Sequence, residues 1–357
     1  MADGDLLRVL ALADTHLGFD LPLRPRVQRR RRGPDFFANT RLALAPARRG
    51  DVDLVVHGGD VLYRSKVRPA LVQMAFEPLL EVADAGVPVV VVPGNHERSA
   101  IPYPLLVAHP HLTVLDRPQT IRLTLAGLRV AVSGFPCARD DIRARFAGLL
   151  AQTRWQDHPA DLRILCMHQT VEGARVGPVG YTFRRGADIL PGRALPAGFA
   201  AVLAGHIHRH QVLTADLGGH PLAAPVLYPG SIERTSSAER DETKGYLILD
   251  LRPEPDTDGS LARWRFEPLP ARPLVDLDLD VAGLDADSLR AALTKHLAGL
   301  DPDAVVTIRP FAPPTPEAAD VLRAPSLRAL APPTMTVSAA RPRRDRKTPA
   351  RPGPDGR

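Results

Sequence analysis

Cysteine is scarce in this 357-residue chain, which has only Cys137 and Cys166. Both lie in apolar surroundings, in the stretches SGFPCA and RILCMH, and we interpret them as buried, reduced thiols. This excludes a small scaffold held together by disulfides, and a chain of this length can bury a core that needs none. The sequence therefore predicts a protein of a reducing compartment, the cytoplasm.

Long apolar runs and aromatic residues are also lacking. No stretch reaches the ~18 consecutive apolar residues of a membrane-spanning helix, and the start MADGDLLRVLAL lacks the pattern of a signal peptide. We expect a soluble protein with no membrane partner. Aromatic residues make up 5% of the chain, which argues against a dedicated surface for stacking single-stranded nucleic acid.

A strong charge of one sign is missing from most of the chain. The net charge is +6, but residues 341–357, rich in Pro and Arg, carry +5 of it. We expect this tail to be disordered, because it cannot form a core. Local basic patches are more informative than net charge. One of them contains Arg29, Arg30 and Arg31, which could contact nucleic-acid phosphates or form a solvated face.

Short apolar runs recur along the first 250 residues and predict buried strands. They are nearly continuous rather than alternating, as expected of strands covered on both faces. The runs are Leu6–Leu12, Val52–Val56, Val89–Val92, Arg129–Ser133, Arg163–Met167, Ala200–Ala204, Pro225–Tyr228 and Tyr246–Leu251. Helical patterns at Pro34–Arg49, Pro69–Ala85 and Arg139–Arg154 separate the early ones. This order predicts an α/β sandwich built around mixed sheets.

A second, smaller domain is expected after residue 270. The polar stretch 252–259 reads as a hairpin or linker, and Arg263–Pro268 as the last strand of a first domain spanning 1–270. Residues 271–340 then alternate strand and helix patterns. The expected elements are Leu274–Val281, Ala286–Leu297, Ala304–Pro310, Pro316–Arg323 and Thr334–Ser338. They predict a small α+β domain.

Polar side chains follow five of the predicted strands of the first domain. They are Asp14 and His16, Asp60, Asn95 and His96, His168, and His206 and His208. Ligands of open α/β sheets bind beyond the carboxyl ends of the strands, so these residues are expected to converge. Any one cluster could be coincidence, but five in register predict a metal site.

The donor set favours two ions over one. Seven oxygen and nitrogen donors without a thiolate exceed the needs of one tetrahedral zinc, but suit two divalent ions that share a carboxylate. Asn95 offers a neutral carbonyl oxygen. Its neighbour His96 would then stand beside the ions rather than bind the same one, as a candidate general acid.

Taken in order, the motifs ADTH, GGD, GNHE, MH and GHIH resemble the signature of the calcineurin-like metallophosphoesterase superfamily over residues 6 to 270. This resemblance implies a two-sheet sandwich flanked by helices. It implies that Asp14, His16, Asp60 and His208 hold one ion. It also implies that Asp60, Asn95, His168 and His206 hold the other, and that His96 assists catalysis.

A narrower resemblance lies in ADTHLGF, GGDVLYRSKV and LYPGSIERTSSAERDETKGYLILDL, which are similar to SbcD-type DNA repair exonucleases. It implies two-metal-ion hydrolysis of DNA phosphodiesters with Mn²⁺, as exonuclease and endonuclease. It further implies that residues 271–340 form a capping domain. The expected partners are DNA, a second copy of the chain and an SbcC-type coiled-coil ATPase, although a Pro/Arg tail follows the cap here instead of the family's ATPase-binding helical segment.

Several other residues, and the function itself, have more than one interpretation. Arg64 and Lys66 could bind DNA phosphates or belong to a solvated loop, and Ser231 and Arg234 could bind a phosphate or serve a tight turn. His57 is expected to support the site rather than bind metal. The alternatives to a DNA nuclease are a phosphoesterase acting on small phosphoesters or phosphoproteins, and a non-catalytic scaffold with the same fold.

Overall fold

The computed structural model describes residues 6–21, 31–97, 107–255 and 257–341. They form two compact units. The first contains residues 6–21 and 32–271, and the second contains Arg31 and residues 272–341. The tail beyond Arg341, which the sequence predicts to be disordered, lies outside the described residues. Arg29 and Arg30 also lie outside them.

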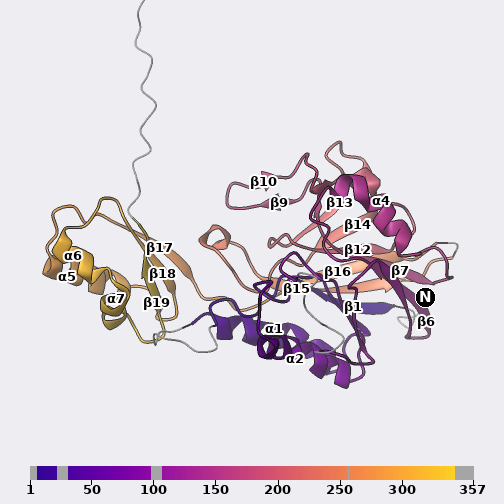
Figure 1. The fold of residues 1–357 in the computed structure, drawn as a ribbon, viewed down its shortest axis with the longest axis horizontal. Helices are drawn as coiled ribbons and strands as arrows, with labels where there is room; N and C mark the ends of the chain where they lie inside the picture. Colours follow the sequence, from indigo (N-terminus) through magenta and orange to yellow (C-terminus); the bar gives the residue numbers. More distant parts are fainter. Residues whose placement is uncertain (1–5, 22–30, 98–106, 256, 342–357) are drawn as a thin grey trace, which may run out of the picture. The chain divides into compact units, whose positions relative to one another are not determined.

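Two six-stranded sheets form the centre of the first unit (Figure 1). The first sheet has the order β16-β15-β1-β2-β3-β4. Its strands are β1 (Leu7–Leu12), β2 (Leu54–His57), β3 (Val89–Val91), β4 (Leu112–Val114), β15 (Gly245–Arg252) and β16 (Ser260–Pro268). Strands β1 to β4 are parallel, whereas β15 and β16 run antiparallel to their neighbours.

The second sheet has the order β13-β14-β12-β7-β6-β5. Its strands are β5 (Gln119–Leu125), β6 (Leu128–Gly134), β7 (Leu162–His168), β12 (Ala201–Gly205), β13 (Gln211–Ala215) and β14 (Pro221–Tyr228). The four inner strands are parallel and the two edge strands are antiparallel to them. Between β7 and β12 lie β8 (Thr170–Val171), β9 (Arg175–Val176), β10 (Tyr181–Thr182), β11 (Ile189–Leu190) and η2 (Gly192–Ala194).

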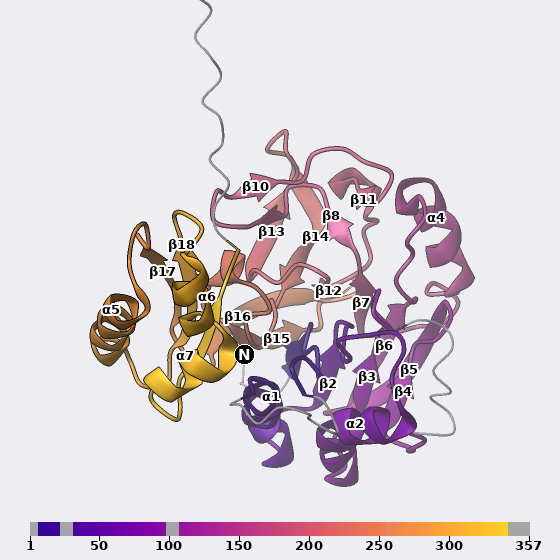
Figure 2. The ribbon, with the colours of Figure 1, turned by 60° about the vertical axis from the view of Figure 1, so that its left-hand side comes forward.

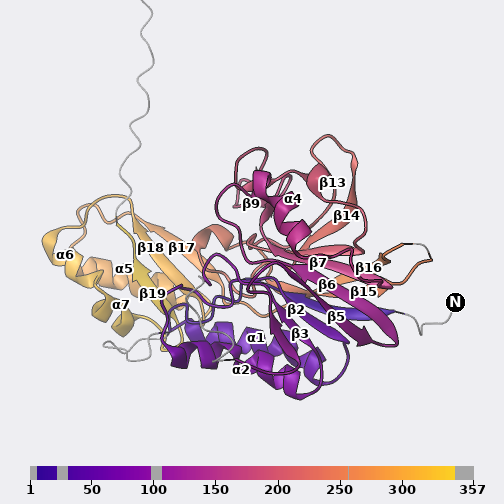
Figure 3. The ribbon, with the colours of Figure 1, turned by 45° about the vertical axis from the view of Figure 1, so that its right-hand side comes forward.

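Helices cover the outer faces of both sheets (Figures 2 and 3). Helices α1 (Gly33–Arg48) and α2 (Pro69–Asp84) pack together on the first sheet, and α4 (Ile142–Gln152) packs on the second. Strand β1 shows why the inner strands read as continuous apolar runs. Leu10 and Leu12 join the cluster beneath the helices, whereas Leu7, Val9 and Ala11 join the cluster between the sheets.

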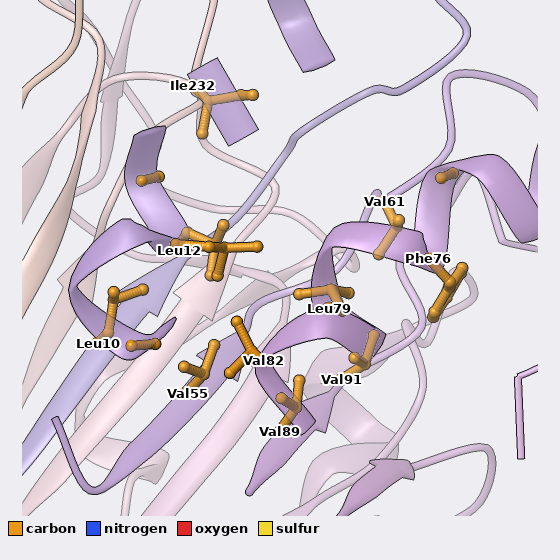
Figure 4. Close-up of a cluster of buried hydrophobic side chains, with 14 of the residues drawn as sticks. Leu10, Leu12, Val55, Val61, Phe76, Leu79, Val82, Val89, Val91 and Ile232 are labelled. Atoms are coloured by element: carbon orange, nitrogen blue, oxygen red, sulfur yellow. The ribbon is translucent and has the colours of Figure 1, made fainter. Parts of the chain in front are cut away.

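The cluster under α2 shows this layered packing in detail (Figure 4). Val55, Val89 and Val91 of the strands meet Leu79 and Val82 of the helix, and all five side chains are almost fully buried. Alternate strand residues therefore face a helix layer on one side and the other sheet on the other. The two-sheet sandwich flanked by helices that the sequence predicted is confirmed.

The second unit is a parallel three-stranded sheet with helices packed against it. Its elements are β17 (Leu274–Leu279), α5 (Ala286–Ala298), β18 (Val305–Pro310), α6 (Pro316–Val321), α7 (Ala324–Leu330) and β19 (Thr336–Ala339). Leu289, Leu293 and Leu297 of α5 are fully buried together with Val306 and Ile308 of β18. The expected order of elements is present, with α7 as an addition.

The sequence prediction differed from the structure in two further respects. In the two large sheets, strands β4, β5 and β13 were missed, because their half-exposed residues give no continuous apolar run. Helix α4 begins at Ile142 instead of near Arg139, because the side chain of Asp141 caps it by accepting a hydrogen bond from the N–H of Ala144. Among the described residues, no helix is long and apolar enough to span a membrane.

Candidate metal centre

Five strands of the two sheets bring polar side chains to one place. Strand β1 leads to Asp14 and His16, β2 to Asp60, β3 to Asn95 and His96, β7 ends at His168, and β12 leads to His206 and His208. The seven residues predicted as ligands, separated by up to 194 positions in the chain, lie within reach of one another. Their convergence follows from the parallel strands, whose carboxyl ends open at the same edge.

Asp14, His16 and His208 form one side of this cluster. The Nε2 atoms of the two histidines are 2.9 Å apart, and His208 Nε2 lies 3.9 Å from Asp14 Oδ1. One donor atom from each of the three residues fits within 4.8 Å of the others. A divalent cation is the species that holds several such donors together at short range.

Asn95, His168 and His206 form the other side. Asn95 Oδ1 lies 3.0 Å from His168 Nε2 and 2.8 Å from His206 Nδ1. Asp60 lies between the two sides. A carboxylate oxygen of Asp60 lies within 4.8 Å of ligand atoms of His16 and His96, and within the same distance of ligand atoms of Asp14 and His168. This is the position that a shared carboxylate needs.

The backbone of the site is held in an unusual conformation. Asp14, His16, Asp60 and His206 have φ values of 51°, 44°, 53° and 86°. Residues other than glycine rarely adopt this left-handed region, which costs free energy unless the surroundings enforce it. Such strain concentrates at functional sites, so it supports a functional role for the cluster.

Gly94 explains the turn between β3 and Asn95. A Cβ atom at this position would lie 2.2 Å from Asp60 Oδ1 and 2.4 Å from the backbone nitrogen of Asp60. Only glycine therefore allows the Pro93-Gly94 turn to pass close to the carboxylate. The turn aims Asn95 back at the strand ends.

The buried charges of the cluster influence one another. Burial raises the pKa of Asp14 to about 6. Burial by itself would lower the pKa of His168, but the carboxylates of Asp60 and Asp14 and the carbonyl of Gly58 together outweigh it and raise that pKa to about 9. Burial likewise opposes ionisation of Asp60, but His168, together with His16 and His96, outweighs it and lowers the pKa of Asp60.

Two other histidines of the cluster, His16 and His206, are held neutral. Burial, together with the charges of neighbouring histidines, lowers the pKa of His16 and of His206 to about 3. A neutral imidazole keeps a lone pair for a cation. His16 Nδ1 is buried and has no hydrogen-bond partner. The seven candidate ligands offer nitrogen and oxygen atoms and no thiolate. The residues present therefore fit a pair of divalent ions that prefer such donors.

His96 is oriented by two contacts. Its Nδ1–H donates to the carbonyl oxygen of Tyr63, and its backbone N–H donates to Asp60 Oδ1 over 2.8 Å. Its other ring nitrogen, Nε2, lies 3.8 Å from Asp60 Oδ2. The ring is partly exposed, with 32% of the side-chain surface accessible, so Nε2 can reach a molecule bound in the cleft.

Glu97, the last residue of GNHE, is a supporting residue that the sequence reasoning missed. Its buried carboxylate accepts hydrogen bonds from the backbone N–H groups of Asp60, Leu62 and Gly94 over 2.8, 2.6 and 2.8 Å. Burial and the charge of Asp60 raise the pKa of Glu97 to about 8, although these hydrogen bonds oppose the rise. Its position directly after Asn95-His96 was the available signal.

His57 also supports the site, as expected. Its Nδ1 accepts a hydrogen bond from the N–H of Gly59 over 3.1 Å, and its Nε2 lies 3.1 Å from the hydroxyl oxygen of Thr15. Burial lowers the pKa of His57 to about 3. Both ring nitrogens are occupied by the loops that carry Asp60 and Asp14, so His57 braces these loops.

A cleft of about 850 Å³ lies beside the cluster. Asn95, His96 and His206 reach it from the cluster, and Arg64, Lys66 and Arg139 supply positive charge to its lining. These three cations would attract a phosphate group to the cleft.

The other described residues predicted to contact DNA do not line this cleft. Ser231 is fully buried and its hydroxyl donates to the carbonyl oxygen of Glu233 over 2.9 Å. The guanidinium of Arg234 donates to the carbonyl oxygens of Glu239 and Glu242 over 3.1 and 3.2 Å. Both side chains thus serve internal contacts. Arg31 is half-buried.

The chain is similar in sequence to several known proteins. Residues 7–210 match the sequence model of the family described as calcineurin-like phosphoesterase. The DNA double-strand break repair protein Mre11 of Haloferax volcanii is 29% identical over 285 residues, which cover 78% of this chain and 56% of that protein. Its counterpart in Halobacterium salinarum is 28% identical over 312 residues, covering 85% of this chain and 70% of that protein.

The chain thus spans about half the length of several of the curated relatives it matches. Among solved structures, a dimetal phosphatase from Danio rerio superposes with a TM-score of 0.41 and 14% sequence identity. That superposition covers 73% of this chain and 98% of the phosphatase.

Proposed function

Because the chain belongs to the calcineurin-like phosphoesterase family, we propose that it is a metal-dependent phosphodiesterase that cuts DNA, as exonuclease and endonuclease. The proposal is carried by one observation. Seven oxygen and nitrogen donors from five strand ends, four of them on buried residues, meet in one cluster beside a cationic cleft. The curated relatives are named DNA double-strand break repair proteins, which supports DNA as the substrate.

Two divalent ions would be held by the seven residues. Asp14, His16, Asp60 and His208 would bind one, and Asp60, Asn95, His168 and His206 the other, with Mn²⁺ as the proposed metal. When bound, such ions polarise a phosphoryl oxygen and lower the pKa of an attacking water. The two aspartates leave part of the ions' charge uncompensated, which favours binding of an anionic phosphodiester.

His96 would handle the proton of the leaving oxygen. Because Nδ1 donates to the carbonyl of Tyr63, Nε2 is the atom free to face the substrate. A histidine whose Nε2 is protonated can give that proton to the leaving oxygen as the ester bond breaks. The hydrogen bond to Tyr63 fixes the ring for this transfer.

Arg64 and Lys66 would bind the phosphates next to the one that is cut. They line the cleft in the loop that follows Asp60, so a DNA strand could run from the cluster onto this loop. Such contacts add affinity without reading sequence. A DNA repair role, an SbcC-type ATPase partner and a homodimer stay predictions.

Digestion of two substrates in parallel tests the proposal. End-labelled single- and double-stranded DNA and the small diester bis-p-nitrophenyl phosphate are incubated with the purified chain and Mn²⁺, and each reaction is repeated with Asp60→Ala. We expect shortening of DNA that disappears in the variant. Turnover of the small diester with intact DNA would overturn the DNA assignment and favour a small phosphoester. No turnover of either substrate would favour a non-catalytic scaffold.

A further inference from the structure

The two ring nitrogens of His208 face different surroundings. Nε2 points into the cluster, 2.9 Å from His16 Nε2 and 3.9 Å from Asp14 Oδ1. Nδ1 points away from it, 3.4 Å from Glu239 Oε1. Thr235 Oγ1 also lies 3.4 Å from Nδ1, but its proton is donated to Glu239 Oε1 over 2.7 Å. A carboxylate only accepts hydrogen bonds, so these contacts favour the proton of His208 on Nδ1. Nε2 then keeps its lone pair for the cluster.

Glu239, in the short helix η3 (Ser237–Glu239), is held in place by several donors. Its Oε1 accepts hydrogen bonds from the hydroxyl of Thr235 over 2.7 Å and from that of Ser236 over 3.1 Å. Its Oε2 forms an ion pair with Lys244 Nζ over 2.7 Å. The carboxylate is buried, with 8% of the residue accessible, so it has little freedom to leave His208.

Lys244 connects this carboxylate to the backbone of His208. Its ammonium group is fully buried and lies 2.8 Å from Glu242 Oε2, while it donates to the carbonyl oxygen of His208 over 2.9 Å. A buried ammonium is tolerated only when such partners surround it. One lysine thus fixes both the main chain of His208 and the carboxylate that faces its ring.

The proposed reaction uses neither Glu239 nor Lys244, and both lie in the sequence block 231–244. We propose that Glu239, locked by Lys244, is the positioning residue of His208: it fixes the Nδ1–H tautomer and aims Nε2 at a metal ion. Carboxylates that hold a ligating histidine in this way typically contribute 10–100-fold to metal affinity. The inference rests on the proposed two-ion centre but does not require DNA as the substrate.

Mn²⁺ binding by Glu239→Gln is the first test, measured by isothermal titration calorimetry on the full chain. A glutamine has one acceptor oxygen and cannot serve both His208 and Lys244. We expect one of the two Mn²⁺ sites to weaken by about 10–100-fold. Glu267→Gln is the matched control, because Glu267 pairs with Arg265 on the surface of β16, and it should bind Mn²⁺ like the wild type.

A second measurement needs no substitution and covers the case in which Glu239→Gln does not fold. In the wild-type chain loaded with Zn²⁺, ¹⁵N-histidine NMR reports which ring nitrogen of His208 carries the proton. We expect a protected Nδ1–H and a ligating Nε2. A proton on Nε2, or unchanged Mn²⁺ affinities in folded Glu239→Gln, would overturn the inference. A wild-type chain that binds no Mn²⁺ would instead overturn the proposed function.

Discussion

The carboxylate of Glu97 accepts a hydrogen bond from the backbone N–H of Asp60 over 2.8 Å. The same carboxylate binds the N–H groups of Leu62 and Gly94. It therefore ties the loop after β2 to the loop after β3. Asp60 and Asn95 come from these two loops, so one buried side chain sets the distance between a shared ligand and its neighbour.

Replacing Glu97 with alanine is expected to destabilise the chain strongly. Three buried N–H groups would lose their acceptor, and each unsatisfied group costs about 1–3 kcal/mol. We predict a fall of about 3 kcal/mol or more in the free energy of unfolding, measured by urea denaturation without metal. Glu77→Ala, which breaks a surface pair with Arg41, should cost less than about 1 kcal/mol. Equal losses in the two variants would refute this role of Glu97.

Gly94→Ala tests the close approach of the turn to Asp60. The added Cβ would meet Asp60 Oδ1 at 2.2 Å, so the carboxylate or the turn must move. We expect weaker Mn²⁺ binding and a loss of about 1–3 kcal/mol of stability. Gly148→Ala is the control, because Gly148 lies inside α4 with open space around it. That change should stabilise the helix by about 0.5–1 kcal/mol.

His96→Ala separates a catalyst from a ligand. Since we assign proton transfer to His96, the variant should keep both Mn²⁺ ions in calorimetry while DNA hydrolysis falls by about 10²–10⁴-fold. His96 is close enough to His16 and Asp60 to share a cation with them. Loss of an ion in this variant would mean that His96 is a ligand instead.

The double change Arg64→Gln and Lys66→Gln tests the DNA track in the cleft. Removing two phosphate contacts should weaken DNA binding uniformly across sequences and lower the slope of log affinity against log salt by about 2. Fluorescence anisotropy of labelled DNA at several salt concentrations measures both effects. Hydrolysis of bis-p-nitrophenyl phosphate should be unchanged. An unaltered salt slope would remove these two residues from the DNA contact.

Much of the fold could be read from the sequence, because the inner strands are buried on both faces and give continuous apolar runs. The run Arg163–Met167 corresponds to β7, whose residues are all buried. The convergence of the ligands followed from the same reasoning, since parallel strands end at one edge. Strand β5 was not predicted because its residues are half-exposed and its apolar residues alternate with polar ones.

Three charged residues that support the site could not be predicted from apolar runs and strand ends. Glu97, Glu239 and Lys244 are charged, and charged residues are normally expected at the surface. Their burial depends on partners that only the folded chain supplies, such as the N–H of Leu62 for Glu97 or the carboxylate of Glu242 for Lys244. The sequence pattern thus predicted the candidate ligands and His57, but not these three charged residues that hold the site in place.

Calorimetric titration of Mn²⁺ into the wild-type chain and Asp60→Ala tests the two-ion centre most directly. Asp60 lies between the two sides of the cluster, so its removal should affect both ions. We expect the wild type to bind two ions and the variant to hold none with comparable affinity. Retention of two ions by Asp60→Ala would contradict the shared carboxylate and the two-ion centre built on it.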